Sequence, residues 1–199
     1  TVGILLLIGG IAFICWVQKS NTKGEELDAI VDSVVQKMDI KAKALAKLGV
    51  DEDEVTEIEP IICNGYYFSN IQSQGYYRND PKDNKLRASN YEVSALFFSA
   101  EQVFSYSYKF SLIAKEESES TDEYFYRDIV SASTASDTVK LNAGVKAGSS
   151  ETANYEYFRL TTSGGTSVSM SIRNAGDAEL TRKINGMKQL LRQKKSQLK

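Results

Sequence analysis

An uncharged apolar run stands at the start of the sequence. Residues 2–17 read VGILLLIGGIAFICWV, and at about 1.5 Å per residue such a helix approaches the ~30 Å hydrocarbon core of a bilayer. A cleaved signal peptide is the main alternative, but no basic residue precedes the run and no small-x-small site follows it. We therefore expect residues 1–18 to be a transmembrane anchor. Lys19 and Lys23 follow the run, so the positive-inside rule predicts a cell-membrane protein, single-pass, with its C-terminal part in the cytoplasm.

Apolar residues recur at spacings of three and four through residues 19–50, which predicts an amphipathic juxtamembrane helix. The stripe consists of Leu27, Ile30, Val31, Val34, Val35, Met38, Leu45 and Leu48. Gly49 is expected to end this helix, and residues 51–54 are read as an acidic linker rather than a calcium loop, because Thr56 stands where an EF-hand needs glycine. The stripe can pack on the following domain, pair with another chain or lie on the membrane, and we favour the first two.

The hydrophobic period changes to two from residue 55 onward. Phe104, Tyr106 and Tyr108 alternate with serines, as in a strand with one face in a core. Seven strands are predicted, at residues 56–63, 91–99, 104–112, 122–128, 129–134 continued at 138–141, 155–161 and 168–172, with a tight hairpin at 163–166. An amphipathic helix over residues 177–195 closes the chain.

Seven antiparallel strands hide their edges only as two packed sheets or a barrel, and one terminal helix can plug an open end. This order resembles the pleckstrin-homology superfold. Three stretches, LFFS at 96–99, YFYRDI at 124–129 and GMKQLL at 186–191, are similar to bacterial membrane-anchored proteins of an uncharacterised family with such a domain. The resemblance implies an α+β, mostly β fold, in which a seven-stranded pleckstrin-homology-like barrel over residues 55–199 is capped by a C-terminal helix. Lipocalin-like and other small barrels remain alternatives.

Composition narrows the chemistry. The chain has 199 residues, 24 Lys and Arg against 26 Asp and Glu, and no histidine, which argues against general nucleic-acid binding and excludes His-dependent catalysis and His-ligated metals. Cys15 lies in the apolar run and Cys63 does not, so neither a disulfide between them nor a thiolate metal cage is expected. No phosphate loop, nucleophile elbow or Cys-x-x-Cys motif occurs. We predict a protein that is not an enzyme, with no catalytic residue, cofactor or metal.

Two groups of basic residues are candidate binding sites. The first lies in the connection between the first two predicted strands and consists of Arg78, Lys82, Lys85 and Arg87. The resemblance implies that this group clasps an anionic headgroup, although Asp80 and Asp83 are interleaved with it. The second lies on the final helix, where it suits an anionic membrane surface or an acidic partner as well as the helix dipole, and consists of Arg182, Lys183, Lys188, Arg192, Lys194 and Lys195.

These patterns predict a membrane-anchored, non-enzymatic binding or scaffolding module that recruits a protein or an anionic lipid at the cytoplasmic membrane surface. One alternative is a structural homo-oligomer assembled through the juxtamembrane helix. Another is a hydrolase in the barrel mouth that uses a Ser-Lys pair or two carboxylates, such as Glu116 and Glu117.

Overall fold

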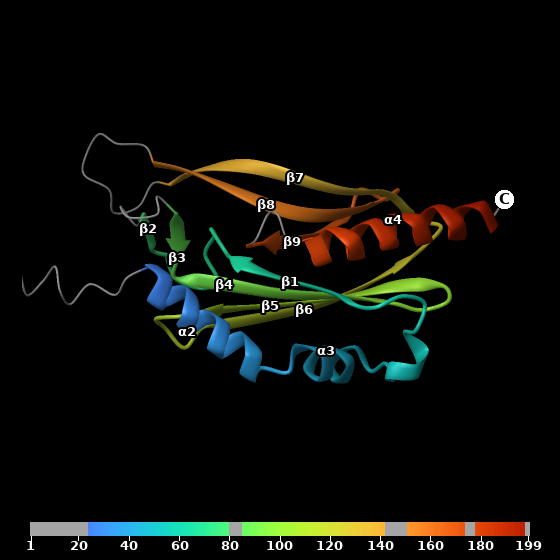
Figure 1. The fold of residues 1–199 in the computed structure, drawn as a ribbon, viewed down its shortest axis with the longest axis horizontal. Helices are drawn as coiled ribbons and strands as arrows, with labels where there is room; N and C mark the ends of the chain where they lie inside the picture. Colours follow the sequence, from blue (N-terminus) through green and yellow to red (C-terminus); the bar gives the residue numbers. More distant parts are fainter. Residues whose placement is uncertain (1–23, 80–84, 142–150, 174–177, 198–199) are drawn as a thin grey trace, which may run out of the picture.

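The computed structural model describes residues 24–79, 85–141, 151–173 and 178–197, and all structural statements below concern these residues. They form an α+β fold, built mostly of antiparallel strands in two main sheets with three α-helices (Figure 1). A pair of short strands, β2 (Tyr77–Asn79) and β3 (Leu86–Ala88), makes a separate small sheet. Helices thus cover a four-stranded sheet on one side, and a three-stranded sheet covers it on the other.

The four-stranded sheet has the order β1-β4-β5-β6. Its strands are β1 (Ile61–Tyr66), β4 (Asn90–Phe98), β5 (Gln102–Ser111) and β6 (Glu117–Phe125). Every residue of β4 is buried, because this central strand has a covered face on each side of the sheet. β6 is an edge strand and is mostly exposed. Its charged and serine residues suit this contact with water.

Helices α2 (Gly24–Lys37) and α3 (Ile40–Leu48) pack on one face of this sheet. The sequence pattern predicts one continuous helix here, but the structure has two. Asp39 adopts a left-handed conformation with φ of 37°, which interrupts the helix, and its carboxylate then accepts a hydrogen bond from the backbone N–H of Ala42. Gly49 ends α3 with φ of 68°, as expected. A short 3-10 turn, η1 (Glu52–Glu54), follows.

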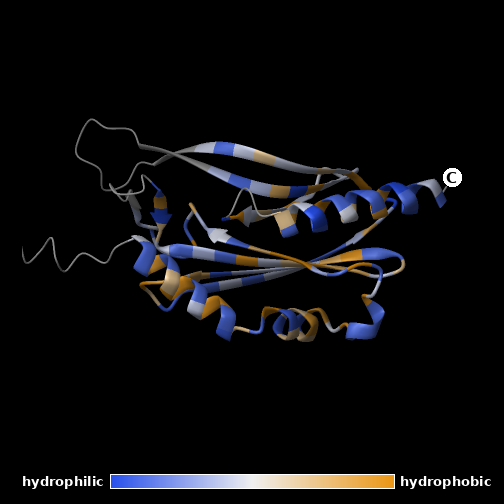
Figure 2. Cartoon of the chain, viewed as in Figure 1, coloured by the Kyte–Doolittle hydropathy of each residue, from blue (hydrophilic) through white to orange (hydrophobic). Residues whose placement is uncertain are grey.

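The three-stranded sheet has the order β7-β8-β9 and faces the other side of the four-stranded sheet (Figure 1). Its strands are β7 (Ile129–Leu141), β8 (Glu151–Thr162) and β9 (Ser167–Ile172). Helix α4 (Ala178–Gln197) lies between the two sheets. Figure 2 shows α4 mostly in hydrophilic colours, and its buried residues are Ile184, Met187, Leu190 and Leu191.

These observations correct the predicted seven-stranded barrel. The two main sheets stay open and do not close into one barrel, and the described residues hold nine strands rather than seven. The two additional strands, β2 and β3, lie in the connection that the sequence pattern predicts as a polar loop. Helix α4 fills the space between the sheets instead of plugging the end of a barrel.

In the described part of the chain, no helix combines the length and the apolar content that crossing a bilayer requires. The transmembrane anchor, the integral membrane partner and the single-pass cell-membrane location expected from the sequence are therefore not found among the described helices. Residues 1–18, to which that expectation applied, lie outside the described residues.

Candidate functional site

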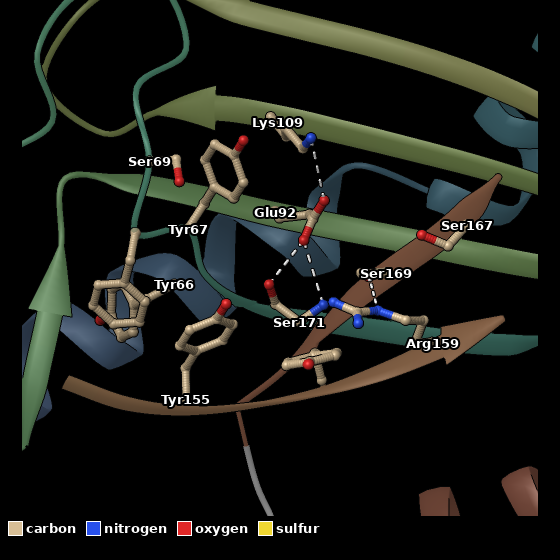
Figure 3. A pocket seen from close by; sticks show the side chains of 12 residues that line it. Tyr66, Tyr67, Ser69, Glu92, Lys109, Tyr155, Arg159, Ser167, Ser169 and Ser171 are labelled. Carbon is tan, nitrogen blue, oxygen red and sulfur yellow. Dashed lines mark hydrogen bonds and ion pairs between the residues drawn. The ribbon is translucent and has the colours of Figure 1, made fainter. Parts of the chain in front are cut away.

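A pocket of about 320 Å³ lies between the two main sheets (Figure 3). One wall comes from the four-stranded sheet and the segment that follows β1, and contains Tyr66, Tyr67, Phe68, Ser69, Glu92 and Lys109. The other wall comes from β8 and β9, and contains Tyr155, Tyr157, Arg159, Ser167, Ser169 and Ser171. The volume is near the lower end of the range of small-molecule sites, about 300–1,000 Å³.

The strand period explains why these side chains meet. On β8 and β9 the odd-numbered positions line the pocket, whereas Phe158, Leu160 and Met170 at even positions enter the hydrophobic core beside α4. The two sheets approach each other where β9 meets β1, and the Arg173 N–H donates to the carbonyl oxygen of Asn64 over 2.9 Å. A Cβ atom at Gly65 would lie 3.0 Å from the Cβ atom of Ser171, so glycine permits this approach.

Glu92 is the central polar group of the pocket and is only 4% exposed. One carboxylate oxygen accepts a hydrogen bond from the Ser107 hydroxyl (2.9 Å) and lies 3.7 Å from Lys109 Nζ. The other oxygen accepts from the hydroxyl (2.8 Å) and the backbone N–H (3.3 Å) of Ser171 (Figure 3). A buried carboxylate needs such partners to offset its desolvation. Glu92 is therefore fully engaged, and it links β4 to β9 across the pocket.

Aromatic rings form much of the remaining wall. The ring of Phe68 lies 6.1 Å from that of Tyr155, which in turn lies 5.5 Å from that of Tyr157. Burial raises the pKa of Tyr155, and the hydrogen bond that the Tyr157 hydroxyl donates to Asp137 over 2.9 Å raises the pKa of Tyr157. Both phenols are therefore neutral at physiological pH and present apolar ring faces with polar edges.

Arg159 supplies the second cation of the pocket. Its guanidinium lies over the Tyr157 ring at 4.7 Å from the centroid, and its Nε–H donates to the Ser169 hydroxyl over 3.1 Å. Among the described residues, no carboxylate lies within ion-pair distance of this guanidinium. Two cations therefore line the pocket, while its single carboxylate, Glu92, is already paired with Lys109.

Of the predicted first basic group, the structure describes the side chains of Arg87 and Lys85. Arg87 is buried on β3, and its Nε and Nη2 atoms donate to the two carboxylate oxygens of Asp28 over 3.1 and 2.7 Å. Lys85 directly precedes β3 and is exposed. Arg78 is the middle residue of β2, where the structure describes its backbone. Lys82 and the side chain of Arg78 lie outside the described parts. Arg87 thus holds α2 against the small sheet.

The second predicted group lies along α4, and several of its members have partners. Lys194 donates to the carbonyl oxygen of Ala100 over 2.8 Å and lies 3.1 Å from a carboxylate oxygen of Glu57. Arg182 and Lys183 each lie 3.6 Å from Glu59. The remaining members, Lys188, Arg192 and Lys195, occur on the same helix. These ion pairs fasten α4 to the segment that precedes β1.

The pocket residues did not emerge from the sequence patterns, although two signals point to them. Glu92 interrupts an otherwise uncharged strand, and Arg159 stands between the core residues Phe158 and Leu160. A charged residue inside such a run marks a position that needs a polar partner, because charged side chains are seldom buried unless they are paired. What the pattern could not show is that the two positions face one pocket, because they belong to different sheets.

No metal-binding cluster of acidic and cysteine side chains occurs among the described residues. Cys63 is buried, which raises the pKa of its thiol to about 12, so this residue is not a reactive nucleophile. Comparison of the chain with protein-family models, with curated proteins and with solved structures gave no match, and the resemblance drawn from the sequence stays an untested prediction.

Proposed function

We propose that this chain is a non-enzymatic binding module that holds a small polar ligand, or the polar end of a larger partner, in the pocket between its two sheets. One observation carries the proposal: the wall combines aromatic rings with a guanidinium that has no carboxylate partner among the described residues. Pockets with apolar walls and a few fixed polar groups are typical ligand sites. Two different sheets form this pocket, and the hydrogen bond from Ser171 to Glu92 links them.

The hydrolase alternative has less support. Glycoside hydrolysis needs two carboxyl groups flanking the scissile bond, about 5–9.5 Å apart. The pocket is lined by one carboxylate, Glu92, whose oxygens already accept from Ser107 and Ser171 and pair with Lys109. A Ser-Lys mechanism would need Lys109 as a free base, but its Nζ atom lies 3.7 Å from a Glu92 carboxylate oxygen. The contacts of Glu92 therefore favour binding over catalysis.

The homo-oligomer alternative also has less support. In the structure, α2 and α3 turn their apolar residues toward the four-stranded sheet of the same chain, and Val31 and Ala44 are fully buried there. Most of the stripe packs on this sheet in full or in part, and Ile30 is the member that stays exposed, so less apolar surface is left to pair with a second copy than the sequence pattern suggests.

The proposal is tested by NMR on the full chain against a panel of monosaccharides, amino acids, nucleosides and short dicarboxylates. We expect saturable amide shifts at pocket residues for at least one class. Replacing Ser169, which lines the pocket, with tryptophan should abolish these shifts, whereas the same change at Ser163, at the exposed β8–β9 turn, should not. Shifts confined to β3 or α4, or chemical conversion of the compound detected by mass spectrometry, would contradict the proposal.

A further inference from the structure

The charge of the pocket restricts the ligand class. Glu92 and Lys109 pair with each other, and Glu92 also accepts from Ser107 and Ser171. This pair needs no further counter-charge. Arg159 adds a positive charge that no carboxylate of the described residues compensates. A guanidinium in a partly closed pocket favours a carboxylate, which it can bind through two parallel hydrogen bonds.

Serine hydroxyl groups line both walls of the pocket, and that of Ser169 accepts from Arg159 Nε. Ser167, Ser169 and Ser171 occupy alternate positions of β9 and line the same wall, and Ser69 lies on the opposite side (Figure 3). A hydroxyl both donates and accepts, and therefore suits a ligand that carries hydroxyl groups of its own. Neither a purely apolar ligand nor a simple ion uses this rim.

The aromatic rings of the pocket further restrict the ligand class. Tyr67 and Tyr155 line the pocket on the same side of Glu92 in the view of Figure 3. The Tyr67 ring also carries Lys109 Nζ at 4.6 Å from its centroid, which helps to fix the ring in place. Such rings pack against the C–H face of a sugar ring, because that face is apolar while its edges carry the hydroxyl groups.

We infer that the pocket binds an acidic monosaccharide of the hexuronate type, with its carboxylate on Arg159, its hydroxyl groups on the β9 serines and its ring face on Tyr155. This inference rests on the proposed function and goes further by naming the ligand class. Its geometry is specific, since Arg159 and the serines belong to neighbouring strands, with Arg159 opposite Ser169 in the β8–β9 register.

The test uses isothermal titration of the full chain with three probes: sodium D-glucuronate, D-glucose and sodium acetate. Glucuronate carries both the carboxylate and the hydroxyl ring, glucose carries the ring without a carboxylate, and acetate carries the carboxylate alone. We expect glucuronate to bind at least about tenfold more tightly than either, because a charge-assisted pair adds to the ring contacts. Added NaCl should weaken glucuronate binding and leave glucose binding unchanged.

Variants then assign the contacts. Arg159→Gln should reduce glucuronate affinity to that of glucose, and Tyr155→Ala should weaken both sugars. Arg127→Gln is the matched control, because Arg127 is an exposed arginine that does not line the pocket, and it should change neither affinity. The three-probe comparison on the unchanged chain keeps the test valid if a variant does not fold.

The outcomes separate the two proposals. Equal binding of glucuronate and glucose, acetate binding as tight as glucuronate, or glucuronate binding that is insensitive to Arg159→Gln overturns the acidic-sugar inference. If none of the three probes binds but another class in the NMR panel shifts the pocket resonances, the ligand class is wrong and the binding module stands. If no compound shifts the pocket, both proposals fail.

Discussion

Asp28 and Asp32 lie one turn apart on α2, and each carboxylate forms an ion pair with one arginine. The two pairs differ mainly in burial. Asp28 accepts from Arg87 Nε (3.1 Å) and Nη2 (2.7 Å) and from the Tyr66 hydroxyl (2.6 Å). Asp32 lies 2.8 Å from Nη1 and 2.8 Å from Nη2 of Arg173. The side chains of the first pair are 25% and 2% exposed, and those of the second are 46% and 21% exposed. We predict that Asp28→Asn is much more destabilising than Asp32→Asn.

The magnitude follows from the position of Arg87. Removing the carboxylate takes the charge and two hydrogen bonds of Asp28 away from a buried guanidinium, and breaking such a pair costs about 3–5 kcal/mol at fully buried sites. Asp28 is partly exposed and asparagine keeps one acceptor oxygen, so we expect a loss of about 3 kcal/mol for Asp28→Asn. For Asp32→Asn, whose pair is much more exposed, we expect a loss of at most about 1 kcal/mol.

The pKa of Asp28 gives the pH dependence. Burial alone would raise it, but hydrogen bonds from Arg87 and Tyr66 and the charge of Arg87 outweigh burial and lower it. A carboxyl group with a lowered folded-state pKa stabilises the fold above its unfolded pKa, about 3.9, and loses this contribution as the pH falls through the folded value. The free energy of unfolding of the Asp28→Asn variant should therefore fall less than that of the unchanged chain when the pH is lowered from 5 through the folded-state pKa of Asp28.

The assay is urea unfolding of the full chain and both variants at pH 7, followed by circular dichroism. The slope against urea should stay constant while the midpoint moves. A variant with both members of the pair replaced, Asp28→Leu with Arg87→Met, should regain most of the loss, because the buried charges of both residues are removed together. If Asp28→Asn costs no more than Asp32→Asn, burial of Arg87 does not control the docking of α2 and our reasoning is refuted.

Three further predictions concern other parts of the molecule. Hydrogen bonds from Lys43 and Lys47 lower the pKa of Glu119 to about 2, so Glu119→Gln should remove about 1 kcal/mol above pH 4.5 and nothing below pH 2, as measured by urea unfolding across pH. Phe158 is fully buried between the sheets, and Phe158→Ala should cost about 3–5 kcal/mol in the same assay; a cost below 1 kcal/mol would contradict this core. The Cys63 thiol, buried and with a pKa raised to about 12, should react with a thiol reagent only after unfolding. The chain also contains Cys15, so the test uses a Cys15→Ser variant, and rapid labelling of this folded variant would disprove the burial of Cys63.

Local patterns in the sequence identified several elements. The alternation at residues 104–112 corresponds to β5 (Gln102–Ser111), and the helix expected at residues 177–195 corresponds to α4 (Ala178–Gln197). Such periods depend only on neighbouring residues. They did not reveal the break at Asp39, where a left-handed residue and its cap divide α2 from α3. They also missed the extent of β6, because its exposed, charged sequence reads as a loop.

The sequence by itself determined seven of the nine described strands, the helix α4 and which side chains of each share a face, because these follow from residue spacing along one element. Only the tertiary structure decided that the sheets remain open, that α4 lies between them, and that Arg87 is held by Asp28. It also decided the pocket, where Glu92 meets Ser171 across 79 residues of sequence. Contacts between residues so far apart in sequence depend on the order and the packing of whole strands, which the hydrophobic spacing within one element does not specify.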